Sequence, residues 1–127
     1  MDELMGIARH RDPEILAITE RDPRYAYEAY PFVLGGVERA VAALEESRHV
    51  SGGELCESLR QLALVRFGPL AKDVLNFWGI RTTMDFGNIV FNLVEACLLL
   101  KTEQDSIADF INVYDFDAAF EEDSGGA

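Results

Sequence analysis

Hydrophobic positions along this chain recur three or four residues apart and hardly ever alternate as they do in β-strands. The clearest stripe comprises Tyr27, Tyr30, Leu34, Val37, Val41 and Leu44. This spacing places the side chains on one face of a helix. Pro31 interrupts the stripe, because proline lacks an amide donor and crowds the preceding turn. A helix therefore either begins near Pro31, after an extended segment, or is kinked there.

Three further helices are predicted from their ends. Residues 1–9 favour a short helix, and Pro13 opens a second one, since proline is well tolerated in the first turn. Ser51 with Glu54 is a capping-box pattern, and Gly68 is typical of a helix end. The side chains predicted to be buried in this third helix are Leu55, Leu59, Leu62 and Ala63.

Pro69 opens the next predicted helix, which Gly79 ends and whose inward side chains are Leu70, Val74, Leu75 and Trp78. Near the end of the chain, Thr102 with Asp105 repeats the capping pattern, and residues 114–122 favour a short helix or turn.

The helix predicted from about Thr83 to Leu99 is apolar on nearly every side, which marks it as the centre of the fold. Its first turn contains Asp85-Phe86-Gly87, a triplet that binds catalytic magnesium in protein kinases. The sequence lacks the glycine-rich loop, the strand lysine and the catalytic loop that a kinase also needs. We interpret Asp85 as a helix cap that pairs with Thr82.

These signals predict an all-α fold, a single compact bundle of five to seven helices with short connections. A chain of 127 residues suits one domain. We expect the helical domain to cover residues 1–120 and residues 121–127 to form an acidic, disordered tail.

The net charge of −12 is concentrated near the end of the chain, where residues 102–127 contain eight acidic side chains and no basic one. A field this negative repels phosphates and disfavours nucleic acid as a partner. Residues 54–80 loosely resemble a helix-turn-helix, but the second helix offers only Lys72 and Asn76 for base contacts.

Cys56 and Cys97 both lie inside apolar helical patterns, so we expect them to be reduced and buried. No Cys/His pair has metal-ligand spacing, and His10 and His49 favour surface or turn positions. We predict no metal site, no cofactor and no catalytic residue. No apolar run approaches the roughly 20 residues of a membrane span, and the first residues do not resemble a signal peptide. A cytoplasmic protein with no membrane partner is expected.

Asn88, Asn92 and Glu95 are polar positions on one face of the predicted central helix. An exposed strip, a structural polar network and a ligand pocket all remain compatible with this pattern. A buried network or pocket would need hydrogen-bond partners, for which Trp78 and Arg81 are candidates. These five residues form the candidate ligand-binding site.

Tyr25, Tyr27, Tyr30 and Phe32 form the densest aromatic cluster of the chain. Tyrosine is frequent in interfaces because one end is apolar and the other makes hydrogen bonds. The cluster is therefore a candidate surface for a protein partner, including a second copy of the chain. A core with a wet edge is the other interpretation.

Several stretches are long enough to be specific for a family. They are "YAYEAYPFVL", "RHVSGGELCESLR", "ALVRFGPLAKDVLNFWGIRTTMDFGNIVFNLVEACLLLKTEQDS" and "YDFDAAF", and together they cover about residues 25–120. On these stretches the chain resembles a family of small uncharacterised bacterial proteins found mainly in planctomycetes and verrucomicrobia. The resemblance implies a free-standing cytoplasmic domain in bacteria, and it implies no activity, ligand or catalytic residue.

Our first hypothesis is a non-enzymatic helical protein–protein interaction module that can self-associate and that presents aromatic and acidic surfaces to its partner. The alternative is a small-ligand or divalent-metal-binding protein, or an enzyme, that uses the polar face around Asn88, Asn92 and Glu95. A nucleic-acid-associated regulator that uses the middle segment is a third and weaker hypothesis.

Overall fold

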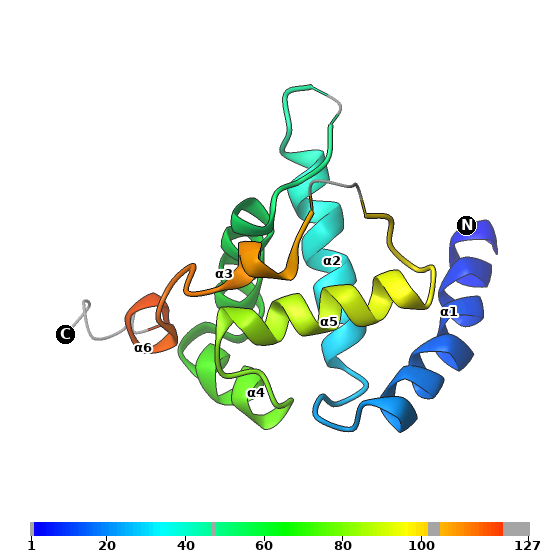
Figure 1. The fold of residues 1–127 in the computed structure, drawn as a ribbon, viewed down its shortest axis with the longest axis horizontal. Helices are drawn as coiled ribbons and strands as arrows, with labels where there is room; N and C mark the ends of the chain where they lie inside the picture. The colour runs from blue at the N-terminus through cyan, green and yellow to red at the C-terminus, as the bar shows by residue number, and fades with distance from the viewer. Residues whose placement is uncertain (1, 47, 102–104, 121–127) are drawn as a thin grey trace.

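The computed structural model has the predicted all-α fold (Figure 1). It describes residues 2–46, 48–101 and 105–120, and of residues 2–11 the backbone alone. Within these ranges the α-helices and two short 3₁₀-helices are α1 (Asp2–Arg21), α2 (Ala29–Ala42), α3 (Gly52–Phe67), η1 (Gly68–Leu70), α4 (Ala71–Phe77), α5 (Thr83–Glu95), η2 (Ile107–Phe110) and α6 (Phe116–Ala119).

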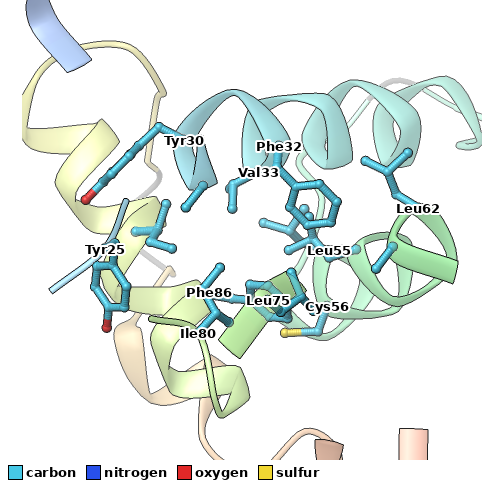
Figure 2. Close-up of a cluster of buried hydrophobic side chains, with 14 of the residues drawn as sticks. Tyr25, Tyr30, Phe32, Val33, Leu55, Cys56, Leu62, Leu75, Ile80 and Phe86 are labelled. Atoms are coloured by element: carbon cyan, nitrogen blue, oxygen red, sulfur yellow. The ribbon is translucent and has the colours of Figure 1, made fainter. Parts of the chain in front are cut away.

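Helix α5 crosses the middle of the molecule, as its apolar sequence predicts (Figure 1). It packs against α1, α2, α3 and η2, and its Phe86, Ile89 and Leu93 side chains are fully buried. Helices α2 and α3 pack on each other, while α1 and α6 lie at opposite edges (Figure 1). Figure 2 shows how side chains from α2, α3, α4 and α5 fill the space between these helices.

Helix α1 is one continuous helix, so the predicted division into residues 1–9 and a second helix from Pro13 is wrong. Proline removes one amide donor from a helix interior, which costs about 3 kcal/mol. Ile15 and Ile18, which follow the proline, are both buried in the core. Their packing holds this part of α1 against the molecule despite the missing hydrogen bond.

Helix α2 begins at Ala29, so Pro31 lies in its first turn, where no amide donor is needed. The prediction that a helix begins near Pro31 is thereby confirmed, although turns rather than an extended segment precede it. Tyr30 and Leu34 of the predicted stripe are buried, whereas Val41 near the end of α2 is 50% exposed.

The predicted ends of α3 are confirmed. Ser51 and Glu54 form a capping box, and Gly68, with φ +55°, follows the last residue. The next helix differs from prediction, because residues 68–70 form η1 and α4 starts only at Ala71. This offset turns Leu70 outward, where it is 61% exposed, and buries Ala71 in its place.

Helix α4 ends in a Schellman motif around Gly79, as predicted for a glycine stop. The amide of Ile80 donates to Leu75 O at 2.8 Å, and the amide of Gly79 donates to Asn76 O at 3.0 Å. Gly79 has φ +95°, a conformation that side chains disfavour. The neighbouring Trp78 carbonyl accepts the amide of Ala26 at 3.0 Å, so this corner also fixes the segment before α2.

Helix α5 ends at Glu95, four residues before the predicted end at Leu99. A second Schellman motif closes it, with the amides of Leu98 and Cys97 donating to Leu93 O and Val94 O at 2.9 Å each. Cys97 occupies the position that Gly79 has in α4, with φ +64°. The bend also exposes Cys97, so the prediction that both cysteines are buried holds only for Cys56.

The chain after α5 covers one side of that helix through η2 and α6. Ser106 and Asp109 cap η2, whereas the capping pair predicted from Thr102 lies outside the described residues. Asp115 caps α6, which confirms the short helix predicted in residues 114–122, and the predicted acidic tail at 121–127 also lies outside the described residues. Within the described part of the chain, no helix is both long and apolar enough to cross a membrane.

Candidate functional site

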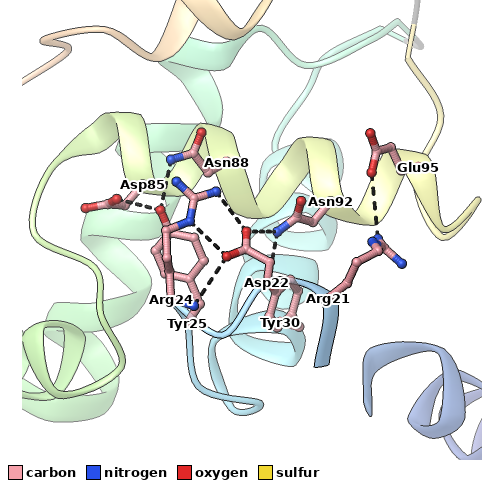
Figure 3. Close-up of polar contacts among 9 residues, drawn as sticks. All are labelled: Arg21, Asp22, Arg24, Tyr25, Tyr30, Asp85, Asn88, Asn92 and Glu95. Atoms are coloured by element: carbon pink, nitrogen blue, oxygen red, sulfur yellow. Dashed lines mark hydrogen bonds and ion pairs between the residues drawn. The ribbon is translucent and has the colours of Figure 1, made fainter. Parts of the chain in front are cut away.

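The polar side chains of α5 form a hydrogen-bond network with the segment between α1 and α2 (Figure 3). The Asn88 amide donates to the Tyr25 hydroxyl at 2.9 Å, and this hydroxyl donates to Asp85 Oδ1 at 2.6 Å. The Asn92 amide donates to Asp22 Oδ2 at 2.8 Å. Of the three interpretations of this face, the structural network therefore describes Asn88 and Asn92.

Two further contacts extend the network along α5. The Asn92 amide also lies 3.0 Å from the hydroxyl oxygen of Tyr30, which is fully buried. Glu95 forms a 3.7 Å ion pair with Arg21, and both of these side chains are more than half exposed. An exposed ion pair of this kind contributes little to stability. Glu95 thus marks the solvent end of the network, while Asn88 and Asn92 fasten the α1–α2 corner to α5.

The other two residues of the predicted ligand site, Trp78 and Arg81, make different contacts. Trp78 belongs to an aromatic cluster, where its ring centroid is 5.5 Å from that of Phe32 and 5.7 Å from that of Phe67. The backbone amide of Arg81 donates to Asp85 Oδ2 at 2.8 Å, as part of the α5 cap. The five residues therefore do not converge on one cavity, and the hydrogen-bond partners of the asparagines are Tyr25, Asp22 and Tyr30 rather than Trp78 or Arg81.

Asp85 acts as the helix cap that the sequence predicts. Its Oδ2 atom accepts the backbone amides of Arg81 and Thr82 at 2.8 and 3.1 Å, while its Oδ1 atom accepts the Tyr25 hydroxyl. Burial, together with the hydrogen bond to this carboxylate, raises the pKa of Tyr25 above its usual range. Tyr25 is therefore protonated at neutral pH and can donate to Asp85.

Asp22 is the charged centre of the network. Arg24 donates two side-chain hydrogen bonds to its carboxylate at 2.8 Å each, and these hold the pKa of Asp22 well below its usual range. The Asn92 amide lowers the pKa further, against the opposing effect of burial. The Asp22 side chain is only 15% exposed, so the pair is partly shielded from solvent.

Acid should weaken this corner of the molecule. A carboxyl whose pKa is depressed by folding stabilises the folded state above its unfolded pKa, and this stabilisation is lost as the pH falls below about 4. We expect Asp22→Asn to lower the free energy of unfolding by about 1–2 kcal/mol at pH 7, with a smaller difference at pH 3. Urea unfolding at the two pH values measures both quantities. Asp73→Asn, at an exposed position of α4, is the matched control, and equal pH dependence in the two variants would contradict the assignment.

The predicted aromatic interface is wrong for three of its four residues. Tyr25, Tyr30 and Phe32 are at most 2% exposed, so they belong to the core and cannot touch a partner. Tyr27 alone is half-buried, and its hydroxyl donates to the Asp12 carboxylate of α1. The sequence could not distinguish these positions, because a tyrosine in a wet core and a tyrosine in an interface follow the same helical spacing.

Three of the acidic side chains within residues 105–120 make contacts inside the molecule. Asp109 and Asp115 cap η2 and α6, and Asp117 forms a 2.5 Å ion pair with Lys72. Lys72 was one of the two side chains considered for base contacts in the helix-turn-helix interpretation, and this ion pair engages it within the molecule. Among the described residues, no three His, Cys, Asp or Glu side chains gather closely enough to hold a metal ion.

A groove between α2 and α5 is the feature that the sequence did not predict. Its volume is about 430 Å³. Side chains of α2 and α5 form its apolar walls, and five consecutive residues after α5 form a further wall. The apolar lining comprises Val37, Val41, Val50, Leu55, Val90, Phe91, Val94, Leu98, Leu99, Leu100 and Phe110.

Polar residues also line the groove. They come from the start of α3, from η2 and from the segment after α5, namely Arg48, His49, Ser51, Lys101, Asp105, Ser106 and Asp109. Arg48 makes a 2.7 Å ion pair with Glu54, and Ser51 and Ser106 cap α3 and η2. The groove lining therefore carries charges of both signs, and an ion pair holds Arg48 while the cap of η2 holds Asp109.

Comparisons of the chain with protein-family models, with curated proteins and with solved structures found no match. The groove and the network are therefore interpreted from their own geometry. One signal in the sequence points toward the groove: residues 96–100 are all apolar or sulfur-containing, and they extend beyond what a single helix face can bury.

Proposed function

We propose that this chain is a non-enzymatic helical interaction module that binds an apolar segment of a protein partner in the groove between α2 and α5. The groove is the observation that supports the proposal. Its volume of about 430 Å³ lies within the usual range for binding pockets. A lining that combines many apolar side chains with a smaller number of polar and charged ones is also usual for a protein interface.

The exposure of the groove edge favours a protein segment over a small molecule. Val41 and Leu100 stand at this edge, and they are 50% and 85% exposed. A small molecule within the cavity would leave both side chains in water. The apolar face of an amphipathic helix could fill the cavity and cover both side chains together.

A matched pair of substitutions tests the groove. Val41 lines it, whereas Val65 lies on α3 outside it and is 71% exposed. Peptides selected from a random displayed library on the purified chain serve as probes, and fluorescence anisotropy gives their Kd. We expect Val41→Glu to weaken binding by about tenfold or more, because a charge would face the apolar peptide. Val65→Glu should leave the Kd within about twofold.

Other outcomes would redirect or overturn the proposal. Equal losses in both variants, or no peptide selected on the chain, would contradict a groove that binds protein segments. Native mass spectrometry that finds a retained small apolar molecule would instead support the small-ligand alternative. Sedimentation velocity on the chain and on Val41→Glu decides whether the partner is a second copy of the chain, as self-association requires.

We also propose a cytoplasmic location and kinship with the small bacterial proteins that the sequence resembles. The free thiols of Cys56 and Cys97 support the location, because disulfides are rare in the cytoplasm. Burial raises the pKa of the Cys56 thiol to about 12, which keeps it protonated and unreactive.

A further inference from the structure

Helix α5 ends at a point where its sequence favours continuation of the helix. Residues 96–100 read Ala-Cys-Leu-Leu-Leu and contain no glycine, asparagine or proline, and alanine and leucine are strong helix formers. The helix nevertheless stops at Glu95. Cys97 then adopts φ +64°, which is unfavourable for any residue with a side chain. The corresponding position of α4 is a glycine, Gly79, so only the α5 motif stores this strain.

The apolar stripe of α5 also continues past the observed end of the helix. Phe86, Val90 and Leu93 are spaced four and three residues apart, and Cys97 and Leu100 continue the same spacing. In the structure Phe86 and Leu93 are fully buried, whereas Cys97 is exposed and Leu100 is 85% exposed. A helix that continued through Leu100 would return both residues to the buried face.

The bent form makes apolar contacts that offset the strain at Cys97. Leu98 and Leu99 are half-buried against the core, and both line the groove. If α5 extended through residue 100, the contacts of Leu98 and Leu99 would be lost. Cys97 and Leu100 would instead be buried on the apolar face of the helix. Two arrangements of this segment thus compete, and each buries part of the same apolar run. The strain at Cys97 raises the free energy of the bent form and so reduces the free-energy difference between the two.

We propose that residues 96–101 switch between the bent form and an extension of α5, and that this switch controls access to the groove. Residues 97–101 form one wall of the groove in the bent form, so extension of α5 removes that wall. A partner that binds better to one form shifts the equilibrium toward it. Control of binding rests on the proposed function, whereas the conformational equilibrium itself does not.

Two substitutions of Cys97 test the switch in the free chain. Cys97→Gly relieves the strain of the bend, and Cys97→Ala favours the helix, while both remove the thiol. Alanine favours the helix and glycine tolerates the positive φ of the bend. The ratio of extended to bent forms should therefore be higher in the alanine variant, on the order of tenfold or more. The Cα chemical shifts of Leu98, Leu99 and Leu100, measured by NMR, should be more helical in the alanine variant. Identical shifts at these three residues would overturn the switch.

The probe peptides then test whether the switch controls the groove. Their Kd should differ between Cys97→Ala and Cys97→Gly in proportion to the shift in populations. A change in chemical shift with an unchanged Kd would refute control of the groove while leaving the switch intact. The Val41 and Val65 comparison is independent of both results, so failure of the switch and failure of the proposed function are distinguishable.

Discussion

Replacement of Gly79 by alanine is expected to lower the free energy of unfolding by about 3 kcal/mol or more, from left-handed strain and overpacking together. Gly79 has φ +95°, and a Cβ atom there would lie inside van der Waals contact with the carbonyl oxygen of Arg24. That carbonyl cannot easily move. The next residue, Tyr25, is buried, and the Ala26 amide is held by Trp78 O at 3.0 Å.

Urea unfolding followed by fluorescence measures this loss, because Trp78 is the single tryptophan and packs against Phe32 and Phe67. Gly53→Ala is the matched control. An added Cβ at Gly53 meets nothing within 4 Å, and alanine is the better helix former, so a gain of up to about 1 kcal/mol is expected. A loss at Gly79 no larger than 1 kcal/mol would contradict the close approach of the two segments.

The expected loss shows which part of the fold local sequence can specify. A stop at Gly79 and caps at Ser51 and Asp85 follow from backbone chemistry within a few residues, and all three were predictable. The contact between Gly79 and the Arg24 carbonyl was not predictable, because Arg24 lies far away in the sequence. No pattern among the residues near Gly79 indicates it. Glycine in a turn signals a conformation, and it does not identify the neighbour that makes the conformation necessary.

The wrong predictions have the same physical origin, namely contacts between residues that lie far apart in the sequence. Helical spacing shows that Tyr27 and Tyr30 lie on one face, but only the neighbouring helices decide whether that face is buried. Trp78 and Arg81 were the candidate partners of the polar face, whereas Asp22, which binds Asn92, lies 70 residues earlier in the sequence. The end of α5 at Glu95 carries no stop residue at all. The groove depends on that end, so the apolar run of residues 96–100 indicates it only indirectly.

Gly87 and Phe110 provide the second large effect, at the contact between α5 and η2. A Cβ atom at Gly87 would lie 2.8 Å from both Cβ and Cγ of Phe110, and 2.9 Å from Cδ2. Thr83 limits any movement of η2, since its hydroxyl donates to Phe110 O at 2.6 Å. Although alanine favours a helix, we expect Gly87→Ala to destabilise the protein by about 2 kcal/mol, and Phe110→Ala by about 3–5 kcal/mol.

The double variant should be far from additive. Phe110→Ala removes two of the three close contacts and leaves the contact with the Cβ atom of residue 110. In that background Gly87→Ala should cost about 1 kcal/mol or less, giving a coupling free energy of about 1–2 kcal/mol. Urea unfolding of the four proteins measures it. An equal cost of Gly87→Ala in both backgrounds would place η2 elsewhere on α5. Since Phe110 lines the groove, the cycle also tests whether the groove has the walls on which the proposed binding depends.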